Sequence, residues 1–258
     1  MDLQVANHLF IVCGASSGFG LAITRALCRE HANVMGIARS EEALIRLQDE
    51  YREQFTGIAG DLREAETLER IEQALNGKTL NGILLNSGGP PAKAAADTSA
   101  EDWDEAYRLL FRWKVELIKK LLPVFLSQKY GRILFIESQS VKQPLGNLVL
   151  STAMRAAVTG YAKTLSQEIG KQGITVNLLA PGSHNTPAID RIIKDKSRQA
   201  NISYNEARSA MEDNISVGRM GEAEELASLA LLLLSPHSAY MTGQTVSHDG
   251  GSNKGLFG

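Results

Sequence analysis

The sequence predicts a doubly wound three-layer α/β fold, built as a single domain over residues 1–258 around a central parallel sheet of about seven strands. Short apolar runs alternate along the chain with longer stretches whose apolar residues recur at helical spacing. Apolar runs without internal alternation are typical of strands buried on both faces, and right-handed crossovers through helices join such strands into a parallel sheet. A length of 258 residues also suits one domain with a sizeable core.

The predicted elements follow in chain order. Each predicted strand ends near glycine or a small polar residue, and the seven runs cover residues 8–14, 32–38, 55–60, 81–89, 131–138, 173–182 and 243–251. Amphipathic stretches predict helices over residues 20–31, 41–54, 65–77 and 223–235. Residues 184–218 are strongly polar and predict one or two short exposed helices, which we expect to form a substrate lid after the sixth strand.

Charge and cysteine usage exclude several classes of function. The 27 basic and 29 acidic residues are scattered along the chain, which indicates neither a nucleic-acid footprint nor a membrane-surface anchor. The first residues do not resemble a signal peptide, and no run of eighteen apolar residues predicts a membrane span. Cys13 and Cys28 lie in apolar surroundings, which favours reduced core thiols and a cytoplasmic protein. No metal site is predicted.

A glycine-rich turn follows the first strand. The segment "CGASSGFG" places Gly14, Gly18 and Gly20 between the strand and the first helix. Glycines let backbone N–H groups and the helix N-terminus approach a pyrophosphate, whose negative charge the helix dipole favours. One glycine turn alone is weak support, because ordinary tight turns also use glycine, but its place between strand and helix favours a dinucleotide site.

Several ordered motifs together resemble the short-chain dehydrogenase/reductase family, and its carrier-protein ketoacyl reductases in overall layout. They are the glycine turn, "GDL" at residues 60–62, "NSGG" at 86–89, Ser138, "PGSHNT" at 181–186 and "MTGQTVSHDGG" at 241–251. The resemblance covers essentially the whole chain and implies a Rossmann-like fold that binds a nicotinamide dinucleotide.

By this resemblance, the cofactor would be held by the glycine turn, by residues at the ends of the second, third and fourth strands, and by the segment after the sixth strand. The implied residues are Gly14, Ser16, Ser17, Gly18, Phe19, Gly20, Arg39, Asp61, Leu62, Asn86, Gly88, Pro181, Gly182, His184 and Thr186. Two of them have ordinary structural alternatives, since Asp61 could be a helix N-cap and Asn86 a turn residue.

The end of the second strand favours NADP(H) over NAD(H). An acidic residue there would bind the ribose 2′-hydroxyl, whereas this chain has Ala38 followed by Arg39 and Ser40. A guanidinium suits a 2′-phosphate dianion. The alternative is that Arg39 is a solvated surface charge or stacks on adenine.

The chain departs from the family at the catalytic positions. In ketone-reducing relatives, a tyrosine thirteen residues after the serine donates the proton, and a lysine four residues later assists it. Here the count from Ser138 lands on Ser151 and Arg155, and no tyrosine in the chain precedes a lysine by four residues. The family's helix-four asparagine, which supports a water relay, is replaced by Leu110.

We therefore predict Ser138, Ser151 and Arg155 as the residues at the reaction centre. A serine hydroxyl is a poor proton donor and arginine does not titrate near neutrality, but Arg155 could bind ribose hydroxyls or stabilise an oxyanion. His184 and Lys142 are alternative proton donors, or merely a solvent-facing histidine and an exposed loop cation.

Three functions stay open on these residues. The first is an NADP(H)-dependent oxidoreductase acting on a carbonyl or hydroxyl compound, either a small molecule or a carrier-bound acyl group. The second is a cofactor-binding sensor, scaffold or noncatalytic subunit, and the third is reduction of a conjugated double bond. The apolar density of residues 107–126 and 224–234, together with the resemblance, predicts a homodimer or homotetramer.

Overall fold

The computed structural model describes residues 2–256, and its centre is a seven-stranded sheet in which every neighbouring pair of strands is parallel. The strands follow the order β3-β2-β1-β4-β5-β6-β9. Their bounds are β1 Leu9–Cys13, β2 Asn33–Ala38, β3 Phe55–Ala59, β4 Gly82–Leu85, β5 Gly131–Ile136, β6 Ile174–Pro181 and β9 Thr245–His248. The predicted fold class is confirmed, and each predicted run contains one of these strands.

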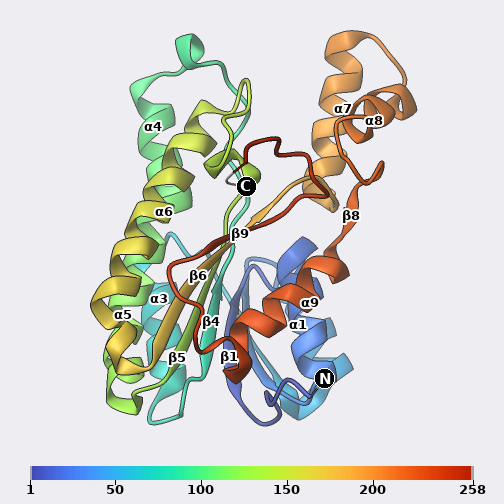
Figure 1. The fold of residues 1–258 in the computed structure, drawn as a ribbon. Coiled ribbons are helices and arrows are strands. Elements are labelled where there is room, and N and C mark those ends of the chain that lie inside the picture. The colour runs from blue at the N-terminus through green and yellow to red at the C-terminus, as the bar shows by residue number, and fades with distance from the viewer. Residues whose placement is uncertain (1, 257–258) are drawn as a thin grey trace.

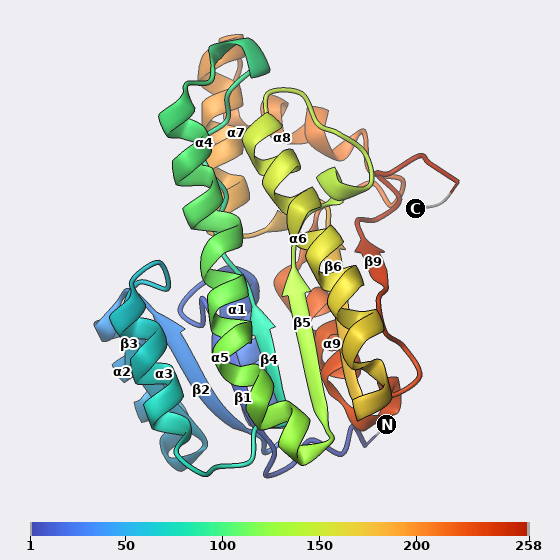
Figure 2. The ribbon, with the colours of Figure 1, turned by 90° about the vertical axis from the view of Figure 1, so that its left-hand side faces the viewer.

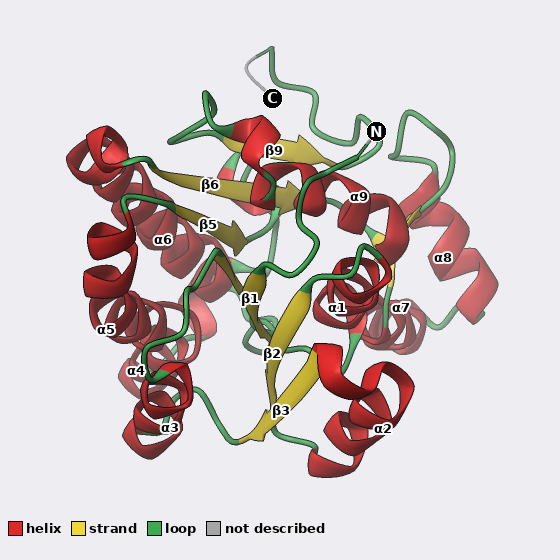
Figure 3. Cartoon of the chain, turned by 90° about the horizontal axis from the view of Figure 1, so that it is seen from below, coloured by secondary structure: helices red, strands yellow, loops and turns green. Residues whose placement is uncertain are grey.

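Helices cover both faces of the sheet, as the view along the layers in Figure 3 shows. One face carries α1 (Gly18–Arg29), α2 (Glu41–Tyr51) and α9 (Ala223–Leu234). The other carries α3 (Ala65–Leu75), α5 (Trp113–Gln128) and α6 (Val149–Ile169), which lie side by side in Figure 2, with α4 (Ala100–Tyr107) standing above α5. Each face has its own large apolar core, so the strands are buried from both sides.

Local sequence signals begin and end these helices. Ser40 accepts a hydrogen bond from the Ala43 N–H at the start of α2, and Ser99 and Asp102 form a capping box at the start of α4. Short 3₁₀ turns join other elements, at Arg52–Gln54, Ala95–Asp97, Gln139–Val141, Gly170–Gln172 and Pro236–Ser238.

A π-helical segment joins α4 to α5 over Arg108–Arg112 and was not predicted from the sequence. Its centre is Leu110, which is fully buried. Such insertions are rare and often lie at functional sites. This one lies at the position where the family has its relay asparagine.

Residues 184–218 include two helices, α7 (Pro187–Ala200) and α8 (Tyr204–Glu212), as predicted for this polar segment. They stand together above the sheet (Figure 1) and enclose a small apolar cluster of Ile193, Ala207, Ile215 and Met220. At their base, β7 (His184–Asn185) pairs in parallel with β8 (Gly221–Glu222). Two-residue strands are too short for a sequence pattern, which is why this ladder was not predicted.

The cysteines agree with their predicted role as core residues. Cys13 and Cys28 are both free and buried, and burial raises the pKa of both thiols, that of Cys28 to about 12. Within residues 2–256, none of the helices combines the length and the apolar character that crossing a membrane requires.

Candidate functional site

A cleft of about 570 Å³ lies at the carboxyl ends of the parallel strands. It begins at the turn between β1 and α1 and extends past the ends of β2, β3, β4 and β5 to α6 and α7. The strand order reverses between β1 and β4, so the crossovers to either side leave a crevice at this edge. Ligands of doubly wound sheets bind at such a crevice.

The glycine turn forms one wall of the cleft. Gly14 and Gly18 have φ values of 73° and 52°, a region that favours glycine. A Cβ on Gly20 would lie 2.0 Å from the Gly14 carbonyl oxygen, so the first turn of α1 packs directly on the strand end. A Cβ on Gly18 would lie 3.8 Å from the side chain of Thr186, which places the residues before α7 against the same turn.

The polar groups at this wall suit a dinucleotide. Ser17 is the N-cap of α1, yet its side chain accepts no hydrogen bond from the helix, and the first turn holds no acidic residue. The amide nitrogen of Asn86 lies 3.0 Å from where a Cβ on Gly14 would be, and the buried Ser87 hydroxyl has no partner among the described residues. An anion with several hydrogen-bonding oxygens would satisfy these groups.

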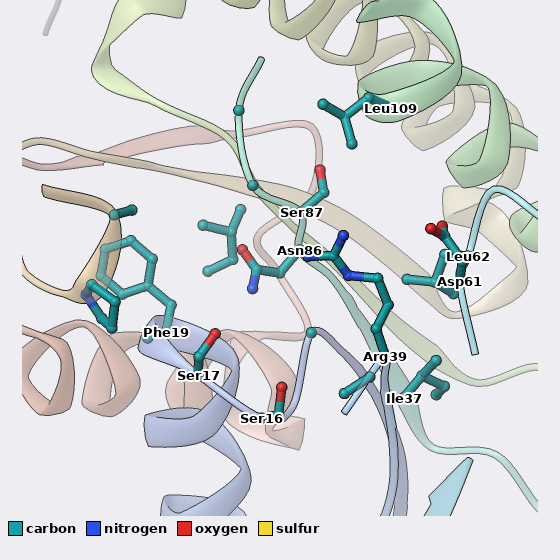
Figure 4. A pocket seen from close by; sticks show the side chains of 18 of the residues that line it. Ser16, Ser17, Phe19, Ile37, Arg39, Asp61, Leu62, Asn86, Ser87 and Leu109 are labelled. Atoms are coloured by element: carbon teal, nitrogen blue, oxygen red, sulfur yellow. The ribbon is translucent and has the colours of Figure 1, made fainter. Parts of the chain in front are cut away.

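Arg39 projects into the cleft from the end of β2, with Ser16 to one side and Asp61 and Leu62 to the other (Figure 4). The residue before it, Ala38, is buried and uncharged. Among the described residues, the Arg39 guanidinium has no ion-pair partner. A cation in this position fits the predicted contact with a 2′-phosphate.

Asp61 is not the N-cap of α3, because Glu64 occupies that position. Instead, Arg63 pairs with Asp61 at 2.7 Å and with Glu105 at 2.5 Å. The hydrogen bonds from Arg63 hold the pKa of Asp61 below its usual value. The carboxylate is therefore ionised at neutral pH and already carries a counter-ion at the edge of the cleft.

A buried group of charges underlies the other end of the cleft. The Lys114 Nζ lies 2.6 Å from Glu137 Oε1, and the Arg155 Nη1 lies 3.0 Å from Glu137 Oε2. The exposed fraction of the side chain is 1% for Lys114, 0% for Glu137 and 7% for Arg155. Two cations thus share one carboxylate inside the protein, and burial lowers the pKa of Lys114.

Ser151 and Arg155 lie one turn apart on α6, and they meet at their side chains. Arg155 donates from Nε to Ser151 Oγ at 3.1 Å and from Nη1 to the Ile136 carbonyl at 3.4 Å. Its Nη2 lies 3.9 Å from where a Cβ on Gly89 would be, and Ser151 Oγ lies 4.0 Å from that point. Arg155 lines the cleft itself, whereas the lining as described does not include Ser151.

Ser138 and His184 lie outside the described lining. The Ser138 hydroxyl accepts a hydrogen bond from the Ser140 N–H at the start of a 3₁₀ turn. His184 does not point to solvent, because it is only 3% exposed. Its Nδ1 lies 3.1 Å from the Gly182 carbonyl oxygen and its Nε2 lies 2.9 Å from His248 Nδ1. Burial lowers the pKa of His184.

The structure brings most of the predicted site residues to one cleft. Its lining includes Gly14, Ser16, Ser17, Gly18, Phe19, Arg39, Asp61, Leu62, Asn86, Gly88, Arg155 and Thr186. Of the other predicted site residues, the lining as described does not include Gly20, Ser138, Ser151, Pro181, Gly182 or His184, nor does it include the alternative proton donor Lys142. Gly182 instead packs beside Asp249, to whose Cβ its own Cβ would approach within 2.8 Å.

The charged lining residues Arg63, Glu105 and Arg191 were not predicted, and neither were the two buried charges Lys114 and Glu137. Lys114 lies on an otherwise apolar face of α5, and Glu137 directly follows the buried strand β5. Each interrupts an apolar pattern with a charge, which is a signal for a buried pair. A charge within an apolar pattern marks each of the two residues in the sequence. Only the fold shows that their side chains are in contact.

Comparison with known proteins agrees with this geometry. Residues 14–253 match the family model described as "Enoyl-(Acyl carrier protein) reductase". The chain is 27% identical over 253 residues to the 3-oxoacyl-[acyl-carrier-protein] reductase FabG of Vibrio harveyi, covering 96% of this chain and 98% of the relative. It is 31% identical over 251 residues to the dehydrogenase/reductase SDR family member 6 of Rattus norvegicus, with coverage of 96% and 98%.

Among solved structures, YwfH, an NADPH-dependent reductase involved in bacilysin biosynthesis, superposes with a TM-score of 0.92 at 26% identity, covering 97% of this chain and all of that one. Fold and cleft define a dinucleotide-binding protein of the doubly wound class. With the family model spanning nearly the whole chain, the protein belongs to the short-chain dehydrogenase/reductase family.

Proposed function

We propose that the protein is an NADP(H)-dependent oxidoreductase that acts on a carbonyl or hydroxyl compound through an unusual reaction centre. The observation that carries the proposal is the position of Arg155 in the cleft that also holds the glycine turn and Arg39. Relatives named as NADPH-dependent reductases support the choice of cofactor. When bound, the reduced nicotinamide would supply a hydride.

Arg155 would stabilise negative charge on the substrate oxygen. Its Nε and Nη1 are already engaged within the protein, whereas no described residue accepts a hydrogen bond from Nη2, which faces Gly89. A fixed, buried guanidinium is an effective donor to an oxyanion, because no reorganisation is needed as the charge develops. Arg155 would supply this charge without giving up a proton.

Ser151 would act beside it as a second donor. Its oxygen accepts the hydrogen bond from Arg155 Nε, so its own hydrogen is directed elsewhere. Ser138 would orient the substrate from the end of β5. The cofactor contacts would come from the residues of the glycine turn, from Arg39, Asp61, Leu62, Asn86 and Gly88, and from residues 181–186.

One observation favours a second candidate, the reduction of a conjugated double bond. Neither alternative proton donor lines the cleft, and both ring nitrogens of His184 are engaged with Gly182 and His248. Hydride addition to such a bond leaves an enolate, which Arg155 could hold until water protonates the carbon. This reaction needs no strong acid at the position of Ser151.

A calorimetric titration with NADPH and, separately, with NADH tests the cofactor part of the proposal. We expect binding that is selective for NADPH, followed by substrate-dependent NADPH oxidation in a panel of ketones and enones. Turnover of enones alone would select the second candidate. Binding without turnover would favour a sensor, scaffold or noncatalytic subunit. If neither nucleotide bound, the result would contradict all three functions: carbonyl reduction, double-bond reduction and noncatalytic cofactor binding.

Restoring the family pair separates a dedicated chemistry from a lost one. In a Ser151→Tyr/Arg155→Lys variant, a phenol and an ammonium replace the hydroxyl and guanidinium. If wild-type activity depends on the pair described here, the variant should lose most of it. A gain of ketone reductase activity from an inert parent would instead identify a noncatalytic protein. Thermal unfolding of both proteins controls for misfolding.

The proposed function also includes a lid over the site, a class of substrate, and the location and assembly of the protein. We propose that residues 184–218, with α7 and α8, form the substrate lid. The substrate would be a small molecule or a carrier-bound acyl group, the latter supported by the names of the ketoacyl reductase relatives. We further propose a cytoplasmic homodimer or homotetramer.

A further inference from the structure

We propose that Glu137 and Lys114 are positioning residues for Arg155, and that Lys114 keeps the Arg155 Nη2 available to the substrate oxygen. This inference rests on the function proposed above. It assigns a role to the two buried charges that the family's known motifs do not include. Its basis is the way in which the three charged side chains divide their hydrogen bonds.

The guanidinium is fixed from several directions. Arginine is a long side chain with several rotatable bonds, and α6 alone would not orient its plane. Ser151 Oγ receives the Nε hydrogen at 3.1 Å, and Glu137 Oε2 and the Ile136 carbonyl both lie near Nη1, at 3.0 Å and 3.4 Å. Glu137 is the only charged member of this set and is completely buried, so it is the strongest of these anchors.

Lys114 determines how the carboxylate is shared. A carboxylate and a guanidinium prefer a two-pronged contact in which both oxygens meet two nitrogens. Here Lys114 occupies Oε1 at 2.6 Å, which leaves Oε2 for Arg155 Nη1. The pairing therefore stays single, and Arg155 Nη2 points toward Gly89 and the cleft.

Stability alone does not account for this arrangement. Removing an ammonium, a guanidinium and a carboxylate from water costs more than their attraction usually returns, and apolar replacements of buried pairs are often as stable. Lys114 is fully buried and lies four residues after Leu110, where apolar side chains would fill the same space. A role in orienting Arg155 gives the charges a function.

The first test uses binding of a small cation and does not depend on turnover. Arg155→Ala would leave a space lined by Glu137 and Ser151, and methylguanidinium chloride is the probe. We expect the probe to raise the thermal midpoint of Arg155→Ala and to bind by calorimetry. In Arg155→Ala/Glu137→Gln the affinity should fall at least about ten-fold, because the charged anchor is gone. Equal affinity in both variants would overturn the inference.

The second test measures the role of Lys114. Lys114→Met keeps the length of the side chain and frees Glu137 to take both Arg155 nitrogens. We expect kcat to fall about 100-fold, the loss seen when one oxyanion donor is removed, while the Kd for NADPH changes less than about two-fold. Lys120→Met is the control, because Lys120 lies on the same helix α5 as Lys114 and pairs at the surface with Glu72 of α3. Unchanged kcat in Lys114→Met would overturn the role of Lys114.

The two tests separate this inference from the proposed function. If methylguanidinium binds only when Glu137 is present but wild type turns over no substrate, the positioning of the guanidinium is supported and the proposed reaction fails. If wild type is active and Glu137→Gln is equally active with an unchanged thermal midpoint, the proposed reaction stands and the inference is wrong.

Discussion

At the scale of single residues, exchanging lysine for arginine changes what a reaction centre can do. A lysine can lower the pKa of a neighbouring tyrosine through its charge alone, whereas an arginine presents several fixed donors and does not titrate. In this chain the guanidinium of Arg155 is placed by Ser151 and Glu137. In the function proposed above, this site would hold negative charge, and the proton would come from another source.

Arg39 should decide the choice between the two nicotinamide dinucleotides. Replacing it by alanine removes a charged contact to the proposed 2′-phosphate, so we expect the Kd for NADPH to rise about 10- to 100-fold, the equivalent of about 1.4–2.7 kcal/mol. The Kd for NADH should change little. Arg46→Ala is a matched control, because Arg46 is exposed on α2 and pairs with Glu42. An equal loss for both nucleotides would assign Arg39 to the adenine instead.

His184 should make stability depend on pH near neutrality. Burial lowers its pKa, so between that pKa and the ordinary value of about 6.5 the unfolded chain binds a proton that the folded chain does not. Stability contributed by the neutral ring is present above pH 6.5 and is lost as the pH falls below it, by at most about 1.4 kcal/mol per pH unit.

Urea unfolding of wild type and His184→Gln at pH 7.5 and 5.5 measures this effect. Wild type should lose more of its free energy of unfolding between the two pH values than the variant does. Equal losses would show that His184 does not carry the dependence.

Single site residues could be predicted from the sequence where the neighbouring residues alone identify the position. Gly14, Gly18 and Arg39 are recognisable from their neighbours alone, and the structure places these three residues in one cleft, whose described lining does not include the third glycine of the turn, Gly20. Glu137 and Lys114 are 23 positions apart and each is recognisable only as a charge in an apolar pattern. Their partnership depends on how α5 packs against β5, which no local pattern contains.

At the scale of elements, the seven strands and the helices α1, α2, α3 and α9 followed from the period of the apolar residues, because strands buried on both faces need continuous apolar runs. The bounds of α4, α5 and α6 were not predicted. The π-helical segment Arg108–Arg112 and the β7–β8 ladder did not follow. Both elements are very short and depend on tertiary contacts. Their apolar residues therefore cannot show the spacing of a helix or a strand. The π-helical segment lies next to the proposed reaction centre, and the β7–β8 ladder lies next to the proposed lid.

The tight packing of α1 on the end of β1 can be tested at Gly20. An alanine Cβ would lie 2.0 Å from the Gly14 carbonyl oxygen, so α1 must shift away from the turn. We expect Gly20→Ala to destabilise the fold by about 1–3 kcal/mol and to abolish NADPH binding in a calorimetric titration.

Gly160→Ala serves as the control for Gly20→Ala, because Gly160 lies within α6 and a Cβ there would meet nothing within 4 Å. That substitution should stabilise the protein by about 0.5–1 kcal/mol and leave binding unchanged. Full NADPH binding by Gly20→Ala would contradict the role of the turn.

At the scale of the whole molecule, the apolar helices do not by themselves require a partner. Most of the apolar side chains of α5 and α9 are buried in the chain's own core. We propose that the chain associates through the free edge of the sheet at β9, which is preceded by the exposed Tyr240 and Met241.

Light scattering at micromolar concentration tests the predicted homodimer or homotetramer. We expect a mass of twice or four times the 28.0 kDa of one chain. Tyr240→Lys, which adds a charge beside the sheet edge, should shift the mass toward one chain. A wild-type mass of 28.0 kDa would remove the prediction.

In the proposed enzyme, the β7–β8 ladder would couple the binding of substrate to the binding of nucleotide. It connects the base of α7 and α8 to the start of α9, and α9 packs along α1, which begins at the glycine turn. A ligand that moved α7 would therefore pull on α1, the helix at which we propose that the dinucleotide binds. By linkage, any factor by which the nucleotide strengthens substrate affinity must equal the factor by which substrate strengthens nucleotide affinity, so the two molecules would report on each other's concentration.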